Sequence, residues 1–403
     1  MVNHKNSQGS GPLKGLRVVE LGMLFAGPLI ATNLADMGAE IIKIEHPKGD
    51  VVRGLGDSSL WWSVVARNKK LVGVDVKKPE GADVVRRLLA TADVFIENFR
   101  PGRVKEWALD YDTLREINPG LVMLHVSGYG QTGPYSKRPG VGTLAEAFSG
   151  YAHVTGEPDG PPTLPSFPLA DGVAALTGTY AILAALWGRD RNGGVGDEID
   201  ISLYEPLLSM TGPMLINYTK AGVVSNREGN RARWSTPRNT YRTKDDRWIA
   251  VSSAADSPAM RLFRAIGRED LTKNPEWATN RERLKRVDEC DGMIADWMLQ
   301  HTQAEIMERM NQFDVLAAPV NDIEGILQDP HVKERGSVVT VADPVLGETV
   351  VQEVVPRFRN APGKINWLGK HEVGTETHDF LVEVGYGTVE ILELQRKGIV
   401  KAS

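Results

Sequence analysis

The residue best suited to covalent chemistry is an aspartate in an uncharged stretch. Asp171 lies in the segment PSFPLADGVAA, and it is the only Asp, Glu, Lys or Arg between residues 160 and 188. An aspartate before an apolar helix can cap that helix, because its oxygen accepts hydrogen bonds from backbone N–H groups. The same geometry keeps a carboxylate ionised in apolar surroundings, where it can attack an activated acyl carbon. Capping of a helix beginning near Ala174 and nucleophilic catalysis both remain open.

A second group of functional side chains is an arginine-rich segment between residues 220 and 242. Such guanidinium groups can bind substrate carboxylates through paired hydrogen bonds, although a solvated loop is the ordinary explanation. We take Arg233 and Arg238 as candidates for substrate binding. The arginines are Arg227, Arg231, Arg233, Arg238 and Arg242.

The sequence lacks the motifs that several other kinds of catalysis require. The eight histidines form no HExxH or comparable spacing, and neither a GxSxG nor a P-loop motif occurs. Cys290 is the only cysteine, which excludes an intrachain disulfide and a cysteine-rich metal site. We therefore expect no metal centre, and a reducing, cytoplasmic environment.

The composition is that of a soluble globular protein. The chain has 403 residues, of which 41% are hydrophobic and 25% are charged, a length that suggests two or three domains. With 47 basic and 52 acidic side chains, the net charge of −5 gives no basic excess for nucleic acid or anionic membrane. The longest apolar run, residues 173–188, is shorter than the ~20 residues of a membrane span. We expect a buried helix there.

Short β-rich runs alternate with helical ones in the first half of the chain. Strands are predicted at 16–21, 39–45, 72–76, 93–97, 121–127 and 198–203, and helices at 28–37 and 79–90. This alternation predicts an α/β fold with a doubly wound parallel sheet. Gly22 and Gly27 in the first turn lack the GxGxxG spacing, so a nicotinamide site is only a weak alternative.

Several of these segments together resemble the class III coenzyme A transferases, the superfamily of formyl-CoA transferase, the acyl-CoA racemases and carnitine CoA-transferase. Each motif is weak alone, but their order and spacing are specific. The motifs are LKGLRVVEL at 13–21, AGP at 26–28, GAEIIKIEHP at 38–47, ADVFIENFRPG at 92–102, SGYGQTGP at 127–134, LAD at 169–171, APVN at 318–321 and DPH at 329–331.

The resemblance implies a fold. Residues 1–215 with 362–403 would form a large Rossmann-like domain that binds coenzyme A. Residues 225–345 would form a smaller α+β domain, joined by linkers. Two subunits, identical or related, would interlock as a dimer.

The resemblance also implies a mechanism and a binding site. Asp171 would carry first a mixed anhydride and then an aspartyl-CoA thioester. Acyl-CoA and a free carboxylic acid would be substrates, with no permanently bound cofactor. The residues that match the coenzyme A site are Phe25, Ala26, His46, Val74, Lys77, Asn98, Phe99, Arg100, Arg103 and Arg138.

The branch of the family is suggested by finer features. The stretch 142–150 resembles the branch that uses succinyl-CoA as donor, and with the arginines it favours a dicarboxylate acceptor. The racemases carry a histidine about thirty residues before the aspartate, where this chain has Val141. Phe25 stands where many relatives have a glutamine. A racemase or isomerase, and a non-catalytic subunit of a heteromeric transferase, remain the alternatives.

Overall fold

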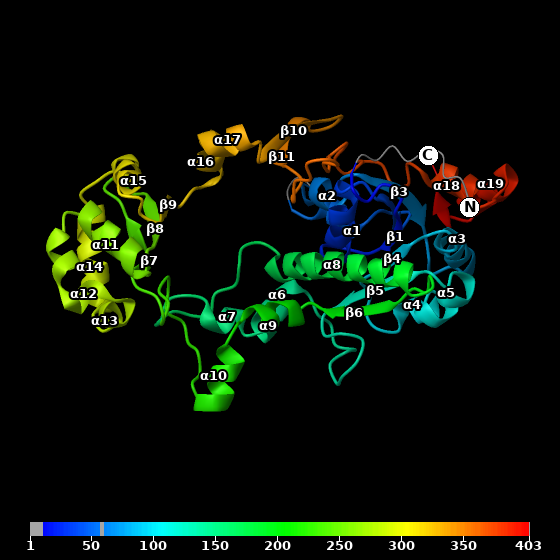
Figure 1. The fold of residues 1–403 in the computed structure, drawn as a ribbon. Coiled ribbons are helices and arrows are strands. Elements are labelled where there is room, and N and C mark those ends of the chain that lie inside the picture. The colour runs from blue at the N-terminus through cyan, green and yellow to red at the C-terminus, as the bar shows by residue number, and fades with distance from the viewer. Residues whose placement is uncertain (1–10, 57–59, 403) are drawn as a thin grey trace. The chain divides into compact units, whose positions relative to one another are not determined.

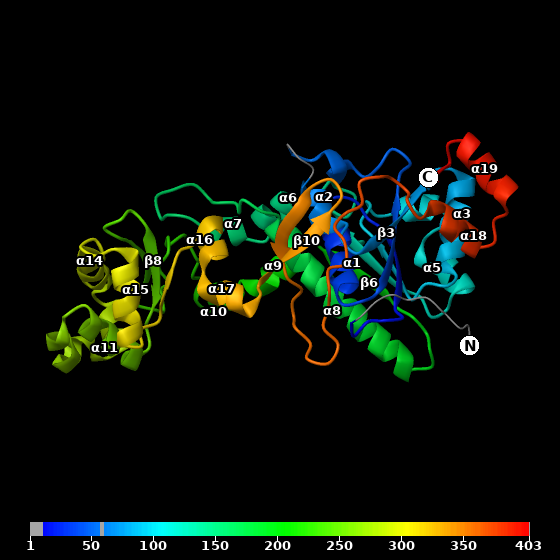
Figure 2. The same cartoon turned by 90° about the horizontal axis from the view of Figure 1, so that it is seen from above.

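The computed structural model describes residues 11–56 and 60–402. Contacts divide the chain into two compact units, whose elements are drawn in Figures 1 and 2. The larger unit comprises residues up to 151, residues 164–216 and residues from 336 onward, and the smaller unit comprises 152–163 and 217–335. The chain thus leaves the larger unit twice and returns to it.

A seven-stranded sheet forms the centre of the larger unit in the described part of the chain. Its order is β12-β3-β2-β1-β4-β5-β6, with all neighbours parallel except β12, which runs antiparallel to β3. This order is that of doubly wound nucleotide-binding folds, and the predicted α/β class is confirmed. The strands are β1 (Arg17–Leu21), β2 (Glu40–Glu45), β3 (Lys69–Val74), β4 (Val94–Glu97), β5 (Val122–Ser127), β6 (Glu198–Ser202) and β12 (Val400–Lys401).

Successive side chains of the strands fill two cores, one on each face of the sheet. Val18 of β1 belongs to the core shared with α1 (Ala26–Asp36) and α8 (Leu169–Arg191). Its neighbour Val19 belongs to the opposite core, shared with α3 (Pro79–Leu89), α18 (Thr377–Glu383) and α19 (Thr388–Arg396). Because both faces are covered, β1 to β5 are buried along almost their whole length. Each fully buried aliphatic side chain contributes roughly 1.5–3 kcal/mol.

Helix α8 packs closely on α1. A β-carbon at Gly178 would stand 2.5 Å from Cδ1 of Ile30, so the two helices approach closely at this glycine. By length and composition α8 could also span a membrane, but a single such helix is weak evidence, and this one lines the protein core. It begins at Leu169 with Pro168 as N-cap, so Asp171 lies inside its first turn. The capping role considered for Asp171 is therefore wrong.

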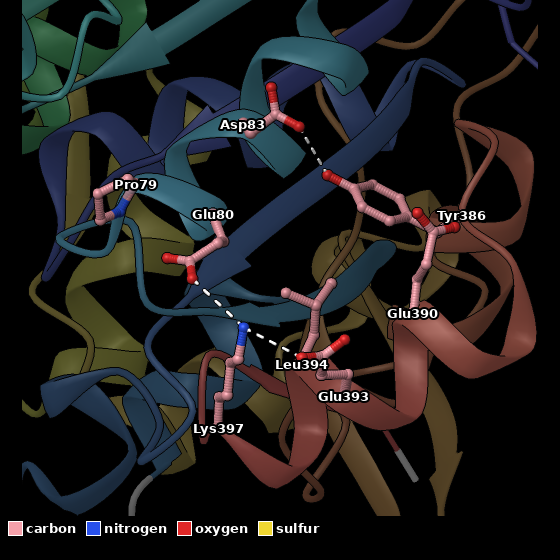
Figure 3. A pocket seen from close by; sticks show the side chains of 8 residues that line it. All are labelled: Pro79, Glu80, Asp83, Tyr386, Glu390, Glu393, Leu394 and Lys397. Carbon is pink, nitrogen blue, oxygen red and sulfur yellow. Dashed lines mark hydrogen bonds and ion pairs between the residues drawn. The ribbon is translucent and has the colours of Figure 1, made fainter.

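The C-terminal segment docks on α3, as Figure 3 shows. The hydroxyl of Tyr386 donates a hydrogen bond to Asp83 over 2.9 Å. Nζ of Lys397 lies 3.7 Å from Glu80 and 3.3 Å from Glu393. Exposed ion pairs contribute little stability. Four apolar side chains of this segment are in the sheet core and hold it in place: Phe380, Leu381, Ile391 and Leu394.

The smaller unit has a three-stranded antiparallel sheet, β7-β8-β9, with helices packed on it. Its fully buried Arg283 donates to the carbonyl oxygens of Thr236 (3.1 Å) and Trp277 (2.9 Å) and pairs with Asp256 (3.1 Å), so its charge is compensated. The elements are β7 (Arg238–Arg242), β8 (Trp248–Ser252), β9 (Ala317–Pro319), α11 (Asp256–Ala265), α12 (Pro275–Ala278), α13 (Asn280–Leu284), α14 (Val287–Met298), α15 (Gln303–Gln312), α16 (Ile323–Gln328), α17 (Pro330–Arg335) and the 3₁₀ helix η2 (Glu269–Lys273).

The remaining elements are short. They are η1 (Val51–Gly54), α2 (Leu60–Val65), α4 (Arg103–Glu106), α5 (Tyr111–Ile117), α6 (Gly142–Phe148), α7 (Tyr151–Val154), α9 (Glu205–Met210), α10 (Met214–Ala221) and the hairpin β10 (Val338–Asp343) and β11 (Gly347–Gln352).

Candidate active site

Asp171 lines a cavity at the carboxyl ends of the sheet strands. The residue is only 9% exposed, and the cavity has a volume of about 880 Å³. Its wall comes from the loops after β1, β4 and β5 and from the starts of α6 and α8. Ligands bind at this edge in doubly wound sheets, because the loops there diverge. Five of the predicted residues share this wall with Asp171: Phe25, Ala26, Asn98, Phe99 and Arg100.

The start of α1 points at the Asp171 carboxylate. The backbone N–H groups of Ala26 and of Asp171 itself are directed at this carboxylate and favour its ionised form. The turn before α1 includes Leu24 with φ of +61°, a conformation that non-glycine residues rarely adopt. A strained turn of this kind persists only where its surroundings hold it.

Asn98 is one of the groups that hold this turn. Its Nδ2 donates to the carbonyl oxygen of Met23 over 2.7 Å, and its Oδ1 accepts from the Met23 N–H over 2.8 Å. The loop after β4 is thereby joined to the loop after β1. The aromatic ring of Phe25 then packs edge-on against Trp61, with centroids 4.9 Å apart.

Buried charges support the same turn from beneath. Nζ of Lys43 donates to Glu20 (2.9 Å), Asp50 (2.9 Å) and the carbonyl of Gly22 (2.5 Å). Nζ of Lys69 donates to Glu20 (2.9 Å) and to the carbonyl of Pro28 (2.7 Å). All four side chains are buried, so the two ammonium groups are paired with two carboxylates and not left alone. Because Lys43 binds the backbone of the turn at Gly22 and Lys69 binds the first turn of α1 at Pro28, the network fixes where α1 begins.

Glu146 is a second acid close to Asp171. It is 2% exposed, and its Oε1 accepts the N–H of Ala170 over 3.1 Å, which satisfies a free donor in the first turn of α8. Burial and, secondly, the negative charge of Glu146 raise the pKa of Asp171 from 3.8 to about 6. The two backbone N–H groups oppose this rise. Asp171 is thus ionised at neutral pH but little solvated, as a carboxylate nucleophile must be.

A second cavity, of about 350 Å³, adjoins the first at Met23 and Phe99, which line both. The predicted residues His46, Val74 and Lys77 line it, at the ends of β2 and β3. The two cavities together therefore contain eight of the ten residues predicted to bind coenzyme A, in addition to Asp171.

Two predicted basic residues lie elsewhere. Arg103 is exposed and pairs with Glu106 over 2.8 Å, and Arg138 stacks on the ring of Tyr135 at 3.6 Å. Neither lines either cavity. Lys77 and Arg100, in contrast, are exposed at the cavities and have no ion-pair partner among the described residues.

The arginine-rich segment lies in the smaller unit, where its side chains are largely paired. Arg233 pairs with Glu228, and Arg231 with Asp288 and Asp291. Arg238 lines a cavity of about 510 Å³ in this unit. Its Nη1 donates to backbone oxygens, whereas Nε and Nη2 have no partner among the described residues.

Comparison with known proteins places the chain in a family. The model of CoA-transferase family III matches residues 13–372. The chain belongs to CoA-transferase family III. The matched range includes the loops after β1, β2 and β4, which line the two cavities.

Relatives and a solved structure agree with this assignment. The succinyl-CoA–D-citramalate CoA-transferase of Chloroflexus aurantiacus is 38% identical over 96% of this chain and 98% of its own. The human succinyl-CoA:glutarate CoA-transferase is 29% identical over 96% of this chain and 90% of its own. A CAIB/BAIF family protein from Brucella suis has a TM-score of 0.82 at 30% identity, covering 93% of this chain and all of that one.

Two residues that lie beside Asp171, Glu146 and Gly142, were not predicted from the sequence. Glu146 is the only Asp, Glu, Lys or Arg between residues 139 and 156, a signal like the one that drew attention to Asp171. Gly142 lies one helical turn before Glu146, and both face Asp171. A glycine and an acid four residues apart on a short helix could have indicated a shared face.

Proposed function

We propose that this family III chain transfers coenzyme A from succinyl-CoA to a second carboxylic acid, a dicarboxylate, through an aspartyl-CoA thioester on Asp171. The observation that carries the proposal is a buried carboxylate, with a pKa of about 6, in the cavity lined by the residues matched to the coenzyme A site. The named relatives act on succinyl-CoA with D-citramalate or glutarate, and another with L-malate.

The reaction balances without a metal ion, a proton donor or ATP. A carboxylate oxygen of Asp171 attacks the thioester carbon, the C–S bond breaks, and a mixed anhydride and the CoA thiolate form. The thiolate attacks the Asp171 carbonyl carbon, which releases succinate and leaves the aspartyl-CoA thioester. The acceptor carboxylate displaces the thiolate to form a second anhydride, and the thiolate then attacks the acceptor's acyl carbon and frees Asp171.

The cavity wall suits this sequence because every covalent intermediate is sensitive to water. The N–H of Ala26 would hold the carboxylate in one orientation, and Phe25 and Trp61 would cover it. Keeping the released thiolate next to the anhydride turns a bimolecular step into an intramolecular one, worth up to about 7–11 kcal/mol of barrier.

Coenzyme A would extend across both cavities. The adenine nucleotide would bind beside His46, Val74 and Lys77, and the pantetheine arm would pass Phe99 to reach Asp171. Lys77 and Arg100, which are unpaired among the described residues, would offset phosphate charge. Arg103 and Arg138 would contribute only after releasing Glu106 and Tyr135. The larger unit would thus be the coenzyme A domain, anticipated as residues 1–215 with 362–403.

Arg238 is the better of the two arginines proposed to bind the acceptor's distal carboxylate. Its free Nε and Nη2 could form a paired contact, whereas the guanidinium of Arg233 is held by Glu228. The smaller domain, anticipated as residues 225–345, would then supply acceptor selectivity.

The alternatives have less support. Racemisation needs a proton carrier beside Asp171, and Val141 lines that cavity, where no histidine occurs among the described lining residues.

We further propose an interlocked dimer in the cytoplasm. The outer face of α8 carries Leu176, Tyr180 and Trp187, each more than 60% exposed, which favours self-association. The related succinyl-CoA–L-malate CoA-transferase has an alpha and a beta subunit. An assay of the purified chain alone decides whether the partner here is an identical or a related subunit.

The direct test replaces Asp171 and varies the acids. Wild-type chain is incubated with succinyl-CoA or acetyl-CoA and a series of mono- and dicarboxylates, and new acyl-CoA products are identified by mass. Asp171→Ala should abolish transfer while coenzyme A still binds, and the exposed control Asp112→Ala on α5 should behave as wild type. Full transfer by Asp171→Ala would refute the assignment.

A further inference from the structure

Ser127 carries a buried hydroxyl without a partner. The residue closes β5 and is 7% exposed, and its Oγ forms no hydrogen bond with any described residue. Its carbonyl oxygen, in contrast, accepts the N–H of Leu203 over 2.9 Å. A buried unsatisfied hydroxyl costs about 1–3 kcal/mol, which folding alone gives no reason to retain.

Ser127 is one of the residues that line the cavity of Asp171. Close contacts between residues that follow Ser127 and residues beside Asp171 link the two positions. A β-carbon on Gly128, the next residue, would stand 2.6 Å from Cα of Gly140. Two residues further on, Gly142 touches the carboxylate of Asp171. Ser127 and Asp171 nevertheless share no hydrogen bond, so the hydroxyl is available for a third group in the cavity.

The proposed chemistry requires a donor at this position. When Asp171 attacks a thioester, negative charge develops on the acyl oxygen, and a hydrogen-bond donor aimed at that oxygen stabilises the transition state. Phe25 offers only hydrocarbon at the mouth of the cavity. The other hydroxyls of the wall, those of Thr143 and Ser166, belong to exposed residues that water can satisfy.

We propose that the Ser127 hydroxyl donates a hydrogen bond to the acyl oxygen that becomes negatively charged when Asp171 attacks the thioester. This inference rests on the proposed function and adds a catalytic residue to it. Ser127 keeps its proton throughout. The electron pair on the oxygen re-forms the C=O bond as the C–S bond breaks and the thiolate leaves. The same donor would serve the attack of the acceptor carboxylate on the aspartyl thioester.

The test uses Ser127→Ala, which removes a hydroxyl that no described residue needs, and Ser127→Thr, which keeps one. Loss of an oxyanion donor typically lowers kcat by about 10²–10³-fold. We expect a loss of that size in Ser127→Ala, with KM and coenzyme A affinity unchanged, Tm no lower than that of wild type, and partial recovery in Ser127→Thr. Ser209→Ala, on α9 and outside both cavities, is the matched serine control and should retain wild-type rates.

A second readout separates this inference from the proposed function. The rate at which succinyl-CoA alone labels Asp171 needs no acceptor, and it should fall in Ser127→Ala by the same factor as kcat. A kcat within twofold of wild type, or a loss confined to KM or Tm, would overturn the role of Ser127 while leaving that of Asp171 intact. Failure of the wild-type chain to be labelled would instead count against the proposed function and this inference together.

Discussion

Gly142 and Asp171 are in direct contact across two helix starts. A β-carbon built on Gly142 would stand 2.0 Å from Oδ2 and 3.0 Å from Cγ of Asp171. No real side chain tolerates the first distance, and the second partner is the carboxyl carbon itself. The start of α6 therefore fixes where the Asp171 carboxylate can lie, and any side chain at position 142 must move the nucleophile.

Gly142→Ala is expected to displace that carboxylate. We predict a fall in kcat of at least 10²-fold, because a misplacement of about 1 Å can cost that much, with coenzyme A affinity little changed. Transfer kinetics and calorimetric binding measure the two effects. Gly188→Ala is the matched control, since only the amide of Asn192, 3.9 Å away, lies near its added carbon. Equal activity of the two variants would contradict the geometry.

Glu146→Gln should move the acid limb of the pH profile. Only ionised Asp171 attacks, so kcat/KM of the wild type should fall below about pH 6. Glutamine keeps an oxygen for the Ala170 N–H but removes the negative charge that raises the pKa of Asp171. The limb should therefore shift to lower pH, whereas Glu116→Gln on exposed α5 should leave it in place. A limb that stays or moves upward would show that Glu146 does not act through charge.

Asp171→Asn should stabilise the fold above pH 6. The pKa of Asp171 is raised in the native state, so the native state binds the proton more tightly than the unfolded chain. The stabilisation that the Asp171 proton gives the wild type is complete below about pH 4, and it is lost as the pH rises to about 6. Asparagine avoids that loss, and Tm should exceed that of wild type by several degrees at pH 8 but not at pH 4. Asp112→Asn should show no such pH dependence.

Asn98→Ala should loosen the turn that presents Ala26. Two hydrogen bonds to Met23 disappear, each worth about 0.5–1.5 kcal/mol. Because Leu24 is held in an unfavourable conformation, we expect the turn to relax and KM for succinyl-CoA to rise about tenfold or more. Asn311→Ala, an exposed position on α15, provides the control. An unchanged KM would mean that the buried lysine network alone holds the turn.

Much of the larger unit was predictable because its strands are buried on both faces. Residues 17–21 and 122–127 are rich in valine and leucine, are buried throughout, and were expected as strands within one residue of their bounds. The start of α8 was not predictable. It has no polar N-cap, and its first turn is completed by Glu146, which lies 24 residues away in sequence. Local patterns do not report such a distant partner.

The site could be predicted where the type of a single residue determines its chemistry. It could not be predicted where the role of a residue depends on which side chains it pairs with in the fold. Asp171 stands out by its isolation in the sequence, and the motif match located both cavities. Arg103 and Arg138 have the right charge, but Glu106 and Tyr135 engage them in the fold. The sequence gives no sign that the Ser127 hydroxyl lacks a hydrogen-bond partner among the described residues, because a serine at the end of a strand is common.

The central claim is that Asp171 carries coenzyme A covalently. Wild-type chain should be mixed with succinyl-CoA without acceptor, quenched in acid, digested and examined by mass spectrometry. The account predicts coenzyme A attached to the peptide that contains Asp171, with the adduct consumed when a dicarboxylate acceptor is added at the rate of turnover. Rapid transfer with no adduct, or with an adduct on another residue, would contradict it.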